Sequence, residues 1–522
     1  MPMDVDTLDI SALQADASMF FTTSGPPSEA VVNEFLKRYE LPALFRGLEF
    51  GDEFTNILIP ILEKIFHTHA GAIALLQSLP YAVAGLGASS ASVRRMTCLG
   101  ISKLIEHSAD DESMLQTVTS SNLIVLVLNT ASDSDDRVAS AGMEVIQNLA
   151  KTSFGINVLF TGKSPAADRL KELIMHGSSL VRIRIFAMIA CLLKNSSQAV
   201  SAIKESGVFK ILELELCNKH DILAQMNALE LLHEIASTPI GANFVIDGGF
   251  LQQLISIMSS TETDGIVRSR SMMVGARLIS PEDSSSSIIS KHDAMSIIGN
   301  LNSFLETLES SQRGEKEAVF DALGRIGMSK NGAELLFEAS SGTALLIEAA
   351  VGKKGGSDQL VAIHALASIA GSERADPLLS NEGEALLRDL IFTAREKLSR
   401  RPLSVSHELI QWLLQQPYET RRAVYRLIIS LAPRPWFVLD ICPNKEIINF
   451  LTDPHSEKSK EGMEWRHACC VAVSRGLFKF DQSIQEQLQE VIAKVQAAVA
   501  RGPYLAREKV EARPLVVTQE RF

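Results

Sequence analysis

The sequence predicts an all-helical protein made of stacked repeats, and three observations support this prediction. The chain has 522 residues, more than one hydrophobic core usually supports. Hydrophobic residues make up 46% and aromatic residues only 6% of the chain, and few Gly, Pro or Asn hairpin signals separate short strands, which favours helices over a β-sandwich or barrel. Apolar residues also recur with helical spacing at an interval of about 43 residues.

The repeat is visible as apolar triplets with i, i+3, i+6 spacing. From the segment 138–153, steps of 43 residues give four sets, in which eleven of twelve positions are apolar and Gly275 is the exception. The sets are Met143, Ile146 and Leu149; Phe186, Ile189 and Leu192; Leu229, Leu232 and Ile235; and Met272, Gly275 and Leu278. After a five-residue slip follow Phe320, Leu323 and Ile326, then Ile363, Leu366 and Ile369, while Cys98, Ile101 and Leu104 precede the first set. The phase predicts that each set is the buried face of one helix.

Glycines recur in phase with these helices. Gly155 begins Gly-Ile-Asn-Val-Leu-Phe, Gly241 begins Gly-Ala-Asn-Phe-Val-Ile and Gly332 begins Gly-Ala-Glu-Leu-Leu-Phe. We expect the small residue to let the chain turn from one helix into the next. Each unit should therefore contain a helix, a glycine turn, a short helix and a further apolar helix such as Phe209–Cys217 or Phe250–Met258.

Units of this length with two or three helices are typical of armadillo and HEAT repeats, in which each unit buries its apolar face against its neighbours. The sequence thus predicts an all-α, right-handed α-solenoid of armadillo/HEAT-like repeats with a period of about 43 residues. We expect an acidic, disordered leader over 1–27, N-terminal capping helices over 28–90, armadillo/HEAT-like repeats over 91–400, C-terminal helical repeats over 401–502 and a tail over 503–522.

The chain is acidic, but unevenly so. Its formal charge of −12 comes from 50 basic and 62 acidic side chains, which opposes binding to a phosphate backbone and argues against nucleic acid as the main partner. Residues 391–522 hold 20 Lys and Arg against 15 Asp and Glu, whereas residues 1–390 hold 30 against 47. The acidic body could steer a basic partner surface, or it could simply keep the protein soluble.

The six cysteines lie in apolar stretches without a C-x-x-C pair, and we interpret them as small core residues in a reducing compartment. They are Cys98, Cys191, Cys217, Cys442, Cys469 and Cys470. The N-terminus is acidic where a secretory signal would be basic, and no uncharged apolar run reaches the roughly 18 residues of a membrane helix. We therefore expect a cytoplasmic protein, with the nucleus as a further possible location.

No motif with the spacing of a catalytic or metal site survives inspection. The run Gly162-Lys163-Ser164 resembles the end of a phosphate-binding loop, but Asn157 stands where its first glycine should be. Two His-Glu pairs that could open a zinc-protease helix lack the second histidine: His407-Glu408 is followed by Gln411, and His233-Glu234 by Ser237. We expect no catalytic activity, no cofactor and no metal.

Three other clusters have simple interpretations. His67 and His69 would diverge on a helix, so they are better explained as turn residues than as metal ligands. Of the adjacent Cys469 and Cys470, one should be core and the other partly exposed. The basic cluster has few interleaved aromatics, which favours a solvated face or an acidic partner over RNA. It comprises Arg400, Arg401, Arg421, Arg422 and Arg426.

The C-terminal third resembles one family in particular. The features that carry the resemblance are the helix Ala423–Leu431, the Pro435-Trp436 dipeptide, the run Ile447-Ile448-Asn449-Phe450, the charged spacer Ser456–Glu461 and the closing Gly502-Pro503-Tyr504. Together with the in-phase glycine units, they resemble the non-ATPase regulatory subunit 5 family of the 26S proteasome. The resemblance implies a non-catalytic chaperone for assembly of the regulatory-particle base, which holds the C-terminal domain of a ring ATPase subunit and is absent from the mature particle.

A general armadillo-repeat scaffold or adaptor, binding peptides or other folded partners, is the alternative. Peptide-binding transport proteins of this fold repeat Trp and Asn along their inner helices, whereas none of the three tryptophans here is in phase with the repeat. They are Trp412, Trp436 and Trp465.

The partner surface is predicted on the final helix of each unit, which in armadillo-like units usually lines the concave side. Polar residues recur at equivalent positions of these helices, although helices that merely face solvent would have the same pattern. The predicted partner-binding residues are Lys210, Glu213, Gln253, Ser256, Asn302 and Glu306.

Overall fold

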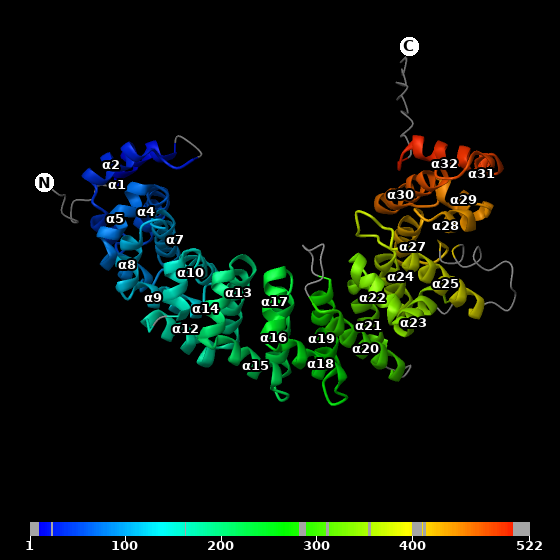
Figure 1. Cartoon of the computed structure of the whole chain (residues 1–522). Coiled ribbons are helices and arrows are strands. Elements are labelled where there is room, and N and C mark those ends of the chain that lie inside the picture. The colour runs from blue at the N-terminus through cyan, green and yellow to red at the C-terminus, as the bar shows by residue number, and fades with distance from the viewer. Residues whose placement is uncertain are drawn as a thin grey trace, which may run out of the picture. The chain divides into compact units, whose positions relative to one another are not determined.

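The computed structural model describes residues 10–21, 25–161, 163–280, 289–308, 313–352, 356–398, 410 and 414–504. These residues form helices joined by short connections, and no strand occurs among them (Figure 1). The predicted all-α solenoid of armadillo/HEAT-like repeats is thereby confirmed. The chain divides into two compact units, one ending at Gln253 and one starting at Leu254. No single helix in the described part of the chain is long and apolar enough to cross a membrane, although two bent helix pairs have sufficient length and composition.

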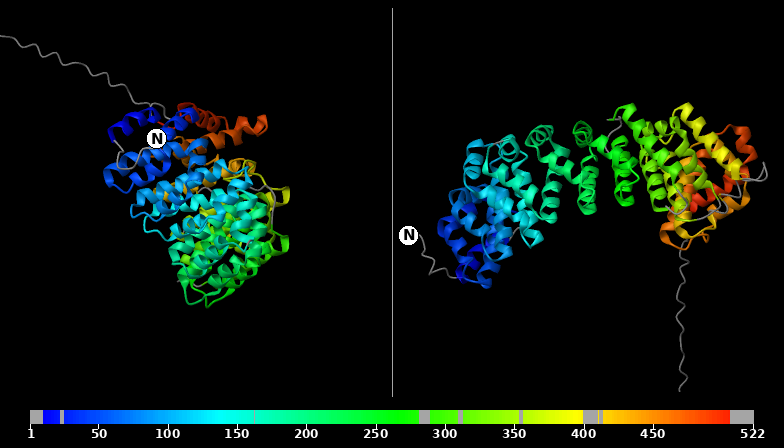
Figure 2. Two further views of the ribbon diagram at one scale, coloured as in Figure 1. Left: turned by 90° about the vertical axis from the view of Figure 1, so that its left-hand side faces the viewer. Right: turned by 90° about the horizontal axis from the view of Figure 1, so that it is seen from below.

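In unit 1, the long helices lie side by side in one row. Each packs on the next in the order α4, α7, α10, α13 and α16, as the blue-to-green ribbons of Figure 1 and the two views of Figure 2 show. A second row, α6, α9, α12 and α15, follows the same order. The long row comprises α4 (Asp52–Phe66), α7 (Ala91–His107), α10 (Asp136–Leu149), α13 (Ser179–Asn195) and α16 (Ile222–Ile235). The second row comprises α6 (Leu79–Leu86), α9 (Leu123–Asn129), α12 (Pro165–His176) and α15 (Val208–Cys217).

Shorter helices join the two rows. They are α5 (His69–Gln77), α8 (Glu112–Ser120), α11 (Ser153–Ile156), α14 (Ser197–Ser206) and α17 (Pro239–Asp247). Helix α11 continues into a π-helical turn over Asn157–Thr161. The N-terminal helices are α1 (Ile10–Ala17), α2 (Glu29–Arg38) and α3 (Leu41–Gly47), and α18 (Phe250–Ser259) contains the boundary between the units.

Unit 2 has the same plan. Its long helices pack in the order α19, α21, α24, α27 and α30. They are α19 (Gly265–Ile279), α21 (Arg313–Ile326), α24 (Ser357–Ile369), α27 (Tyr418–Leu431) and α30 (Lys460–Leu477). The others are α20 (Lys291–Thr307), α22 (Lys330–Glu338), α23 (Ser340–Val351), α25 (Asn381–Leu398), α28 (Pro435–Ile441), α29 (Lys445–Thr452), α31 (Gln482–Gln487) and α32 (Gln489–Arg501).

The apolar triplets found in the sequence form part of the core of each unit. Every triplet lies on a long helix, and all of its members are buried, including Gly275. Ile189 on α13 is 1% exposed and Leu232 on α16 is 0% exposed. The periodicity therefore identified the helix faces that hold neighbouring repeats together.

The in-phase glycines have a different role from the predicted turn. Gly241 is the third residue of α17, and its amide donates to the Oγ1 atom of the capping residue Thr238. A Cβ at this position would overlap the carbonyl oxygen of Ile235 at the end of the preceding long helix. Gly155 and Gly332 occupy the same position after Thr152 and Ser329, and so does Gly71 after Thr68. Glycine is required here because two helices meet with almost no space between their backbones.

We expect Gly241→Ala to destabilise the protein by about 1–3 kcal/mol, because overpacking forces the backbone to shift. The matched control is Gly299→Ala on α20, where a Cβ would meet nothing within 4 Å. That substitution should stabilise the helix by about 0.5–1 kcal/mol, because glycine is a poorer helix former than alanine. Urea unfolding followed by circular dichroism measures both, and equal midpoints for the two variants would contradict the close approach.

Part of the expected disordered leader is helical. Within 1–27, α1 is followed by a 3₁₀ turn over Ser18–Phe21, and Leu13 and Phe20 are completely buried. The Tyr39 hydroxyl also donates a hydrogen bond of 2.8 Å to Oδ2 of Asp16. The expectation of disorder was therefore wrong for residues 10–21, because the apolar residues among the acidic ones share one helix face.

Candidate functional site

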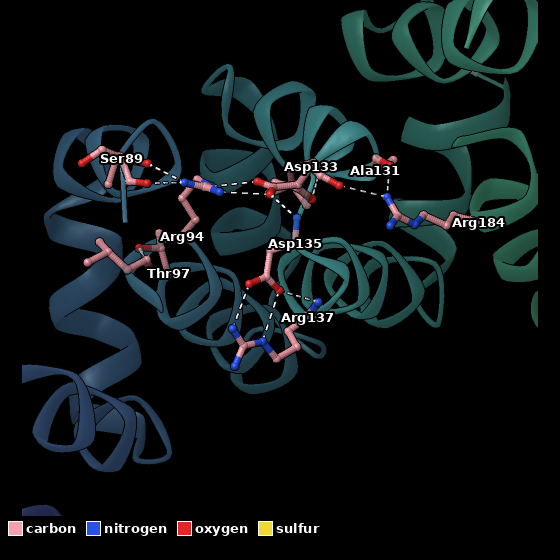
Figure 3. Close-up of polar contacts among 12 residues, drawn as sticks. Ser89, Arg94, Thr97, Ala131, Asp133, Asp135, Arg137 and Arg184 are labelled. Atoms are coloured by element: carbon pink, nitrogen blue, oxygen red, sulfur yellow. Dashed lines mark hydrogen bonds and ion pairs between the residues drawn. The ribbon is translucent and has the colours of Figure 1, made fainter. Parts of the chain in front are cut away.

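A network of hydrogen bonds fixes neighbouring repeats in unit 1 (Figure 3). Arg94 on α7 donates from Nε to Oδ2 of Asp133 at 2.7 Å and from Nη2 to Oδ1 at 3.0 Å. Its Nη1 atom also donates to the carbonyl oxygens of Ala88 and Ser89, both at 2.9 Å. The hydrogen bonds from Arg94 hold the pKa of Asp133 below its usual value.

The long helix that follows α10 reaches the same connection from the other side. Arg184 on α13 donates to the carbonyl oxygens of Ala131 at 2.7 Å and Asp133 at 3.2 Å, and it forms an ion pair with Asp136. The long helices on either side of α10 thus both bind the segment that precedes it (Figure 3). Because these charged groups already have partners, the network positions the repeats and offers no reactive group.

The solvent-facing side of α13 is apolar. Leu180 and Ile183 are 54% and 39% exposed, and Ala187 and Cys191 further along the helix are also exposed. Their spacing places them on one helix face, opposite the buried set that contains Ile189. A helix that is apolar on both faces is normally buried on both faces. We call Leu180, Ile183, Ala187 and Cys191 the α13 stripe.

Carboxylates occupy the matching position on both neighbouring long helices. Glu144 on α10 lies 43 residues before Ala187, and Glu230 on α16 lies 43 residues after it. Both side chains are exposed. On α16, Leu223 repeats the position of Leu180 and is 64% exposed. The face therefore has an apolar centre with acidic neighbours, a pattern found in protein-binding surfaces.

The residues predicted for partner binding lie on α15, α18 and α20, and none of them lies on α13. Lys210, Glu213, Ser256 and Glu306 are exposed. Gln253 is half-buried, and its Nε2 atom donates to Oε1 of Glu213 at 2.8 Å, which brings these two predicted residues together. Partner binding by these residues stays a prediction.

Asn302 differs from the other predicted partner-binding residues because its side chain is buried. It is only 7% exposed, and its Nδ2 atom donates to the carbonyl oxygen of Ala339 at 2.8 Å. A Cβ on Gly342 would overlap its Oδ1 atom. Asn302 therefore faces α23 and joins two helices, so the expectation that it lines a partner surface was wrong.

The cysteines also depart from expectation in part. Cys469 and Cys470 are both buried, although one was expected to be partly exposed, and burial raises the pKa of Cys470 to about 11. Conversely, Cys191 and Cys217 are exposed rather than in the core.

The three arginines of the basic cluster that the structure describes are each paired with a carboxylate. Arg421 pairs with Glu457, Arg422 with Glu461 and Arg426 with Glu373. This pairing leaves little free positive charge on α27 for a nucleic acid.

No group of three or more metal-ligating side chains occurs in the described ranges. The rings of His69 and His107 lie 5.8 Å apart, edge to face. Some residues considered from the sequence fall outside the described part of the chain: Gly162, Arg400, Arg401, His407, Glu408, Gln411 and Trp412.

Comparison with known proteins gives consistent matches. The protein named 26S proteasome non-ATPase regulatory subunit 5 from Bos taurus is 22% identical over 498 residues, 90% of each chain. Its counterpart from Homo sapiens is 20% identical over 431 residues, 81% of each chain. The Mus musculus protein of the same name is 24% identical over 213 residues, and this match spans only 41% of either chain.

Among solved structures, an engineered protein matches 88% of this chain and 98% of its own, with a TM-score of 0.36 and 16% identity. A designed armadillo repeat protein in complex with the peptide (KR)4 matches 44% of this chain and 95% of its own, with a TM-score of 0.31 and 17% identity. The family described as Proteasome non-ATPase 26S subunit matches residues 25–516. Because this match covers nearly the whole chain, the protein belongs to the proteasome non-ATPase 26S subunit family.

Proposed function

We propose that this protein is a non-catalytic chaperone for assembly of the base of the 26S proteasome regulatory particle. In this proposal it holds the C-terminal domain of a ring ATPase subunit, acts in the cytoplasm and is absent from the mature particle. Its family membership and the regulatory subunit 5 relatives support a role connected with the proteasome. The observation that carries protein binding is the α13 stripe, with exposed Leu180 and Ile183 between acidic neighbours.

Such a surface suits a folded partner. Apolar side chains at the centre of an interface lose their water on binding and supply most of the affinity, whereas the charged rim selects the partner and speeds the encounter. Glu144 and Glu230 would favour a partner with basic side chains around an apolar patch. The arginine network described above keeps the long helices in place, so little order has to be gained on binding.

The test is capture of purified C-terminal domains of the regulatory-particle ATPases by the full chain. We expect one of the domains to bind, and Leu180→Glu with Ile183→Glu to weaken binding about tenfold or more, the equivalent of about 1.4 kcal/mol. The matched control is Leu439→Glu with Phe478→Glu, at exposed apolar positions of unit 2. Both double variants should keep the melting temperature of the parent, because substitutions at exposed positions have small effects on stability.

Two outcomes would count against the proposal: no capture of any ATPase domain by the parent chain, or equal capture by the stripe and control variants. The partner surface predicted from the sequence is tested in the same assay with Glu213→Lys and Glu306→Lys. Each substitution should weaken capture of the ATPase domain if α15 and α20 contribute to binding. Binding of unfolded peptides but of no folded ATPase domain would favour the alternative, a general armadillo scaffold.

A further inference from the structure

The connection after α24 in unit 2 is longer than the connections after α10, α16 and α21. In three other repeats, the Ser or Thr that caps the next helix follows three residues after the long helix ends, as Thr238 follows Ile235. After α24, which ends at Ile369, the equivalent capping serine is Ser380, whose Oγ atom accepts from the amide of Gly383. The connection 370–380 is therefore an insertion in the repeat. Insertions of this kind commonly form the binding face of a repeat protein.

Two arginines hold this connection in a fixed conformation. Arg374 donates to the carbonyl oxygens of Gly327 at 2.8 Å and of Ile369 and Pro377 at 3.0 Å. Arg434, 1% exposed, donates to the carbonyl oxygens of Ala370 at 3.1 Å and Pro377 at 3.2 Å. A ligand at this connection would meet a surface that is already formed.

The insertion, α27 and α30 line a groove of about 400 Å³. The helices α24, α27 and α30 follow one another in Figure 1. This volume lies within the range of ligand-binding pockets, about 300–1,000 Å³. Apolar atoms of Pro377, Ile429, Pro433 and Ala472 line it.

The groove is basic in a protein that is acidic overall. Arg374, Arg475 and Lys479 line it against one carboxylate, Asp376. Arg475 is exposed and has no carboxylate partner among the residues that the structure describes. The Nζ atom of Lys479 donates to the carbonyl oxygen of Pro433, at 3.4 Å. Burial, followed by the nearby Arg434 charge, lowers the pKa of Arg374 to about 10.

We propose that this groove binds a short acidic segment of a protein partner. An apolar side chain of the segment packs against Ile429 and Ala472, and adjacent carboxylates pair with Arg475 and Lys479. The apolar wall distinguishes this site from a simple anion site, because phosphate would leave that wall in contact with water. The site lies on elements other than the α13 stripe and is independent of the proposed ATPase-domain contact.

The experiment uses fluorescence anisotropy with the full chain and a fluorescein-labelled peptide in which two glutamates flank a central leucine on each side. We expect this peptide to bind, and its counterparts with lysines for the glutamates or alanine for the leucine to bind at least about tenfold more weakly. In the chain, Arg475→Glu with Lys479→Glu should raise Kd about tenfold or more. The matched control, Lys330→Glu with Lys445→Glu, reverses two exposed lysines of unit 2 outside the groove.

Failure of the glutamate peptide to bind would overturn the proposal, as would equal weakening by the groove and control variants, which would indicate general charge attraction. Displacement of the peptide by inorganic phosphate at equal concentration, together with indifference to the leucine, would reduce the groove to an anion site. Circular dichroism melting of each variant verifies that the repeats remain folded.

Discussion

Glu457→Ala should lower the free energy of unfolding of the C-terminal repeats by about 3–5 kcal/mol, because it leaves buried polar partners without an acceptor. Glu457 is 2% exposed. Its carboxylate accepts from Nε of Arg421 at 2.7 Å, from Nη2 of Arg421 at 2.8 Å and from the Tyr425 hydroxyl at 2.7 Å. These bonds join α27 to the segment that precedes α30. Urea unfolding, with hydrogen exchange to localise the loss to α27 and α30, measures the effect.

The effect should also depend on pH. Burial alone would raise the pKa of Glu457, but the hydrogen bonds from Arg421 and Tyr425 outweigh it, and the net pKa is lowered. A lowered pKa in the folded state means that the carboxylate stabilises the fold at pH values above the ordinary glutamate pKa of about 4.3. This stabilisation disappears as the pH falls through the folded value. The stability difference between the parent and Glu457→Ala should therefore be largest near neutral pH and shrink in acid.

Glu461→Ala is the control, because it removes a carboxylate from the same region without breaking a buried network. Glu461 lies 3.3 Å from Arg422, and both side chains are 50% exposed. Exposed pairs of this kind contribute about 0–1 kcal/mol. Equal losses of unfolding free energy in the two alanine variants would refute the role assigned to the buried pair. So would a stability difference between the parent and Glu457→Ala that grows as the pH falls.

The repeat and its core faces could be predicted from the sequence because they depend on local periodicity. Packing of one repeat on the next requires apolar side chains at a fixed phase, and Ile189 and Leu232 display that phase directly. The role of Gly241 was missed because a close approach between two backbones leaves no residue pattern beyond the glycine itself. Asn302 was misplaced because a polar residue on a helix can bond to a neighbouring backbone as well as to water.

The candidate sites were harder to predict. The sequence did contain a signal for the α13 stripe, since Leu180 and Ile183 give their helix a second apolar face, but exposure depends on which neighbours cover that face. The groove depends on an insertion that folds against α27 and α30, and Arg374 holds that insertion through backbone carbonyls. Contacts of this kind join residues far apart in the chain and follow no short spacing.

Leu232→Ala should destabilise unit 1 by about 2–5 kcal/mol, through lost burial and the cavity left behind. Leu232 is 0% exposed on α16, which packs against α13 and α15. Because each repeat is stabilised mainly by its neighbours, the loss should weaken α13 and α15 together with α16. Hydrogen exchange should therefore accelerate in all three helices, and the urea midpoint should fall.

Leu223→Ala on the same helix is the matched control, since it removes the same atoms from a side chain that is 64% exposed. Its effect on stability should stay within about 0.5 kcal/mol. Ile189→Ala and Ile183→Ala form a second pair on α13, with exposures of 1% and 39%. If the exposed and buried members of each pair destabilised the protein equally, the triplets would not be the surfaces that join the repeats. If only the buried members do so, the α13 stripe, which we propose as the binding face, can be altered without loss of stability.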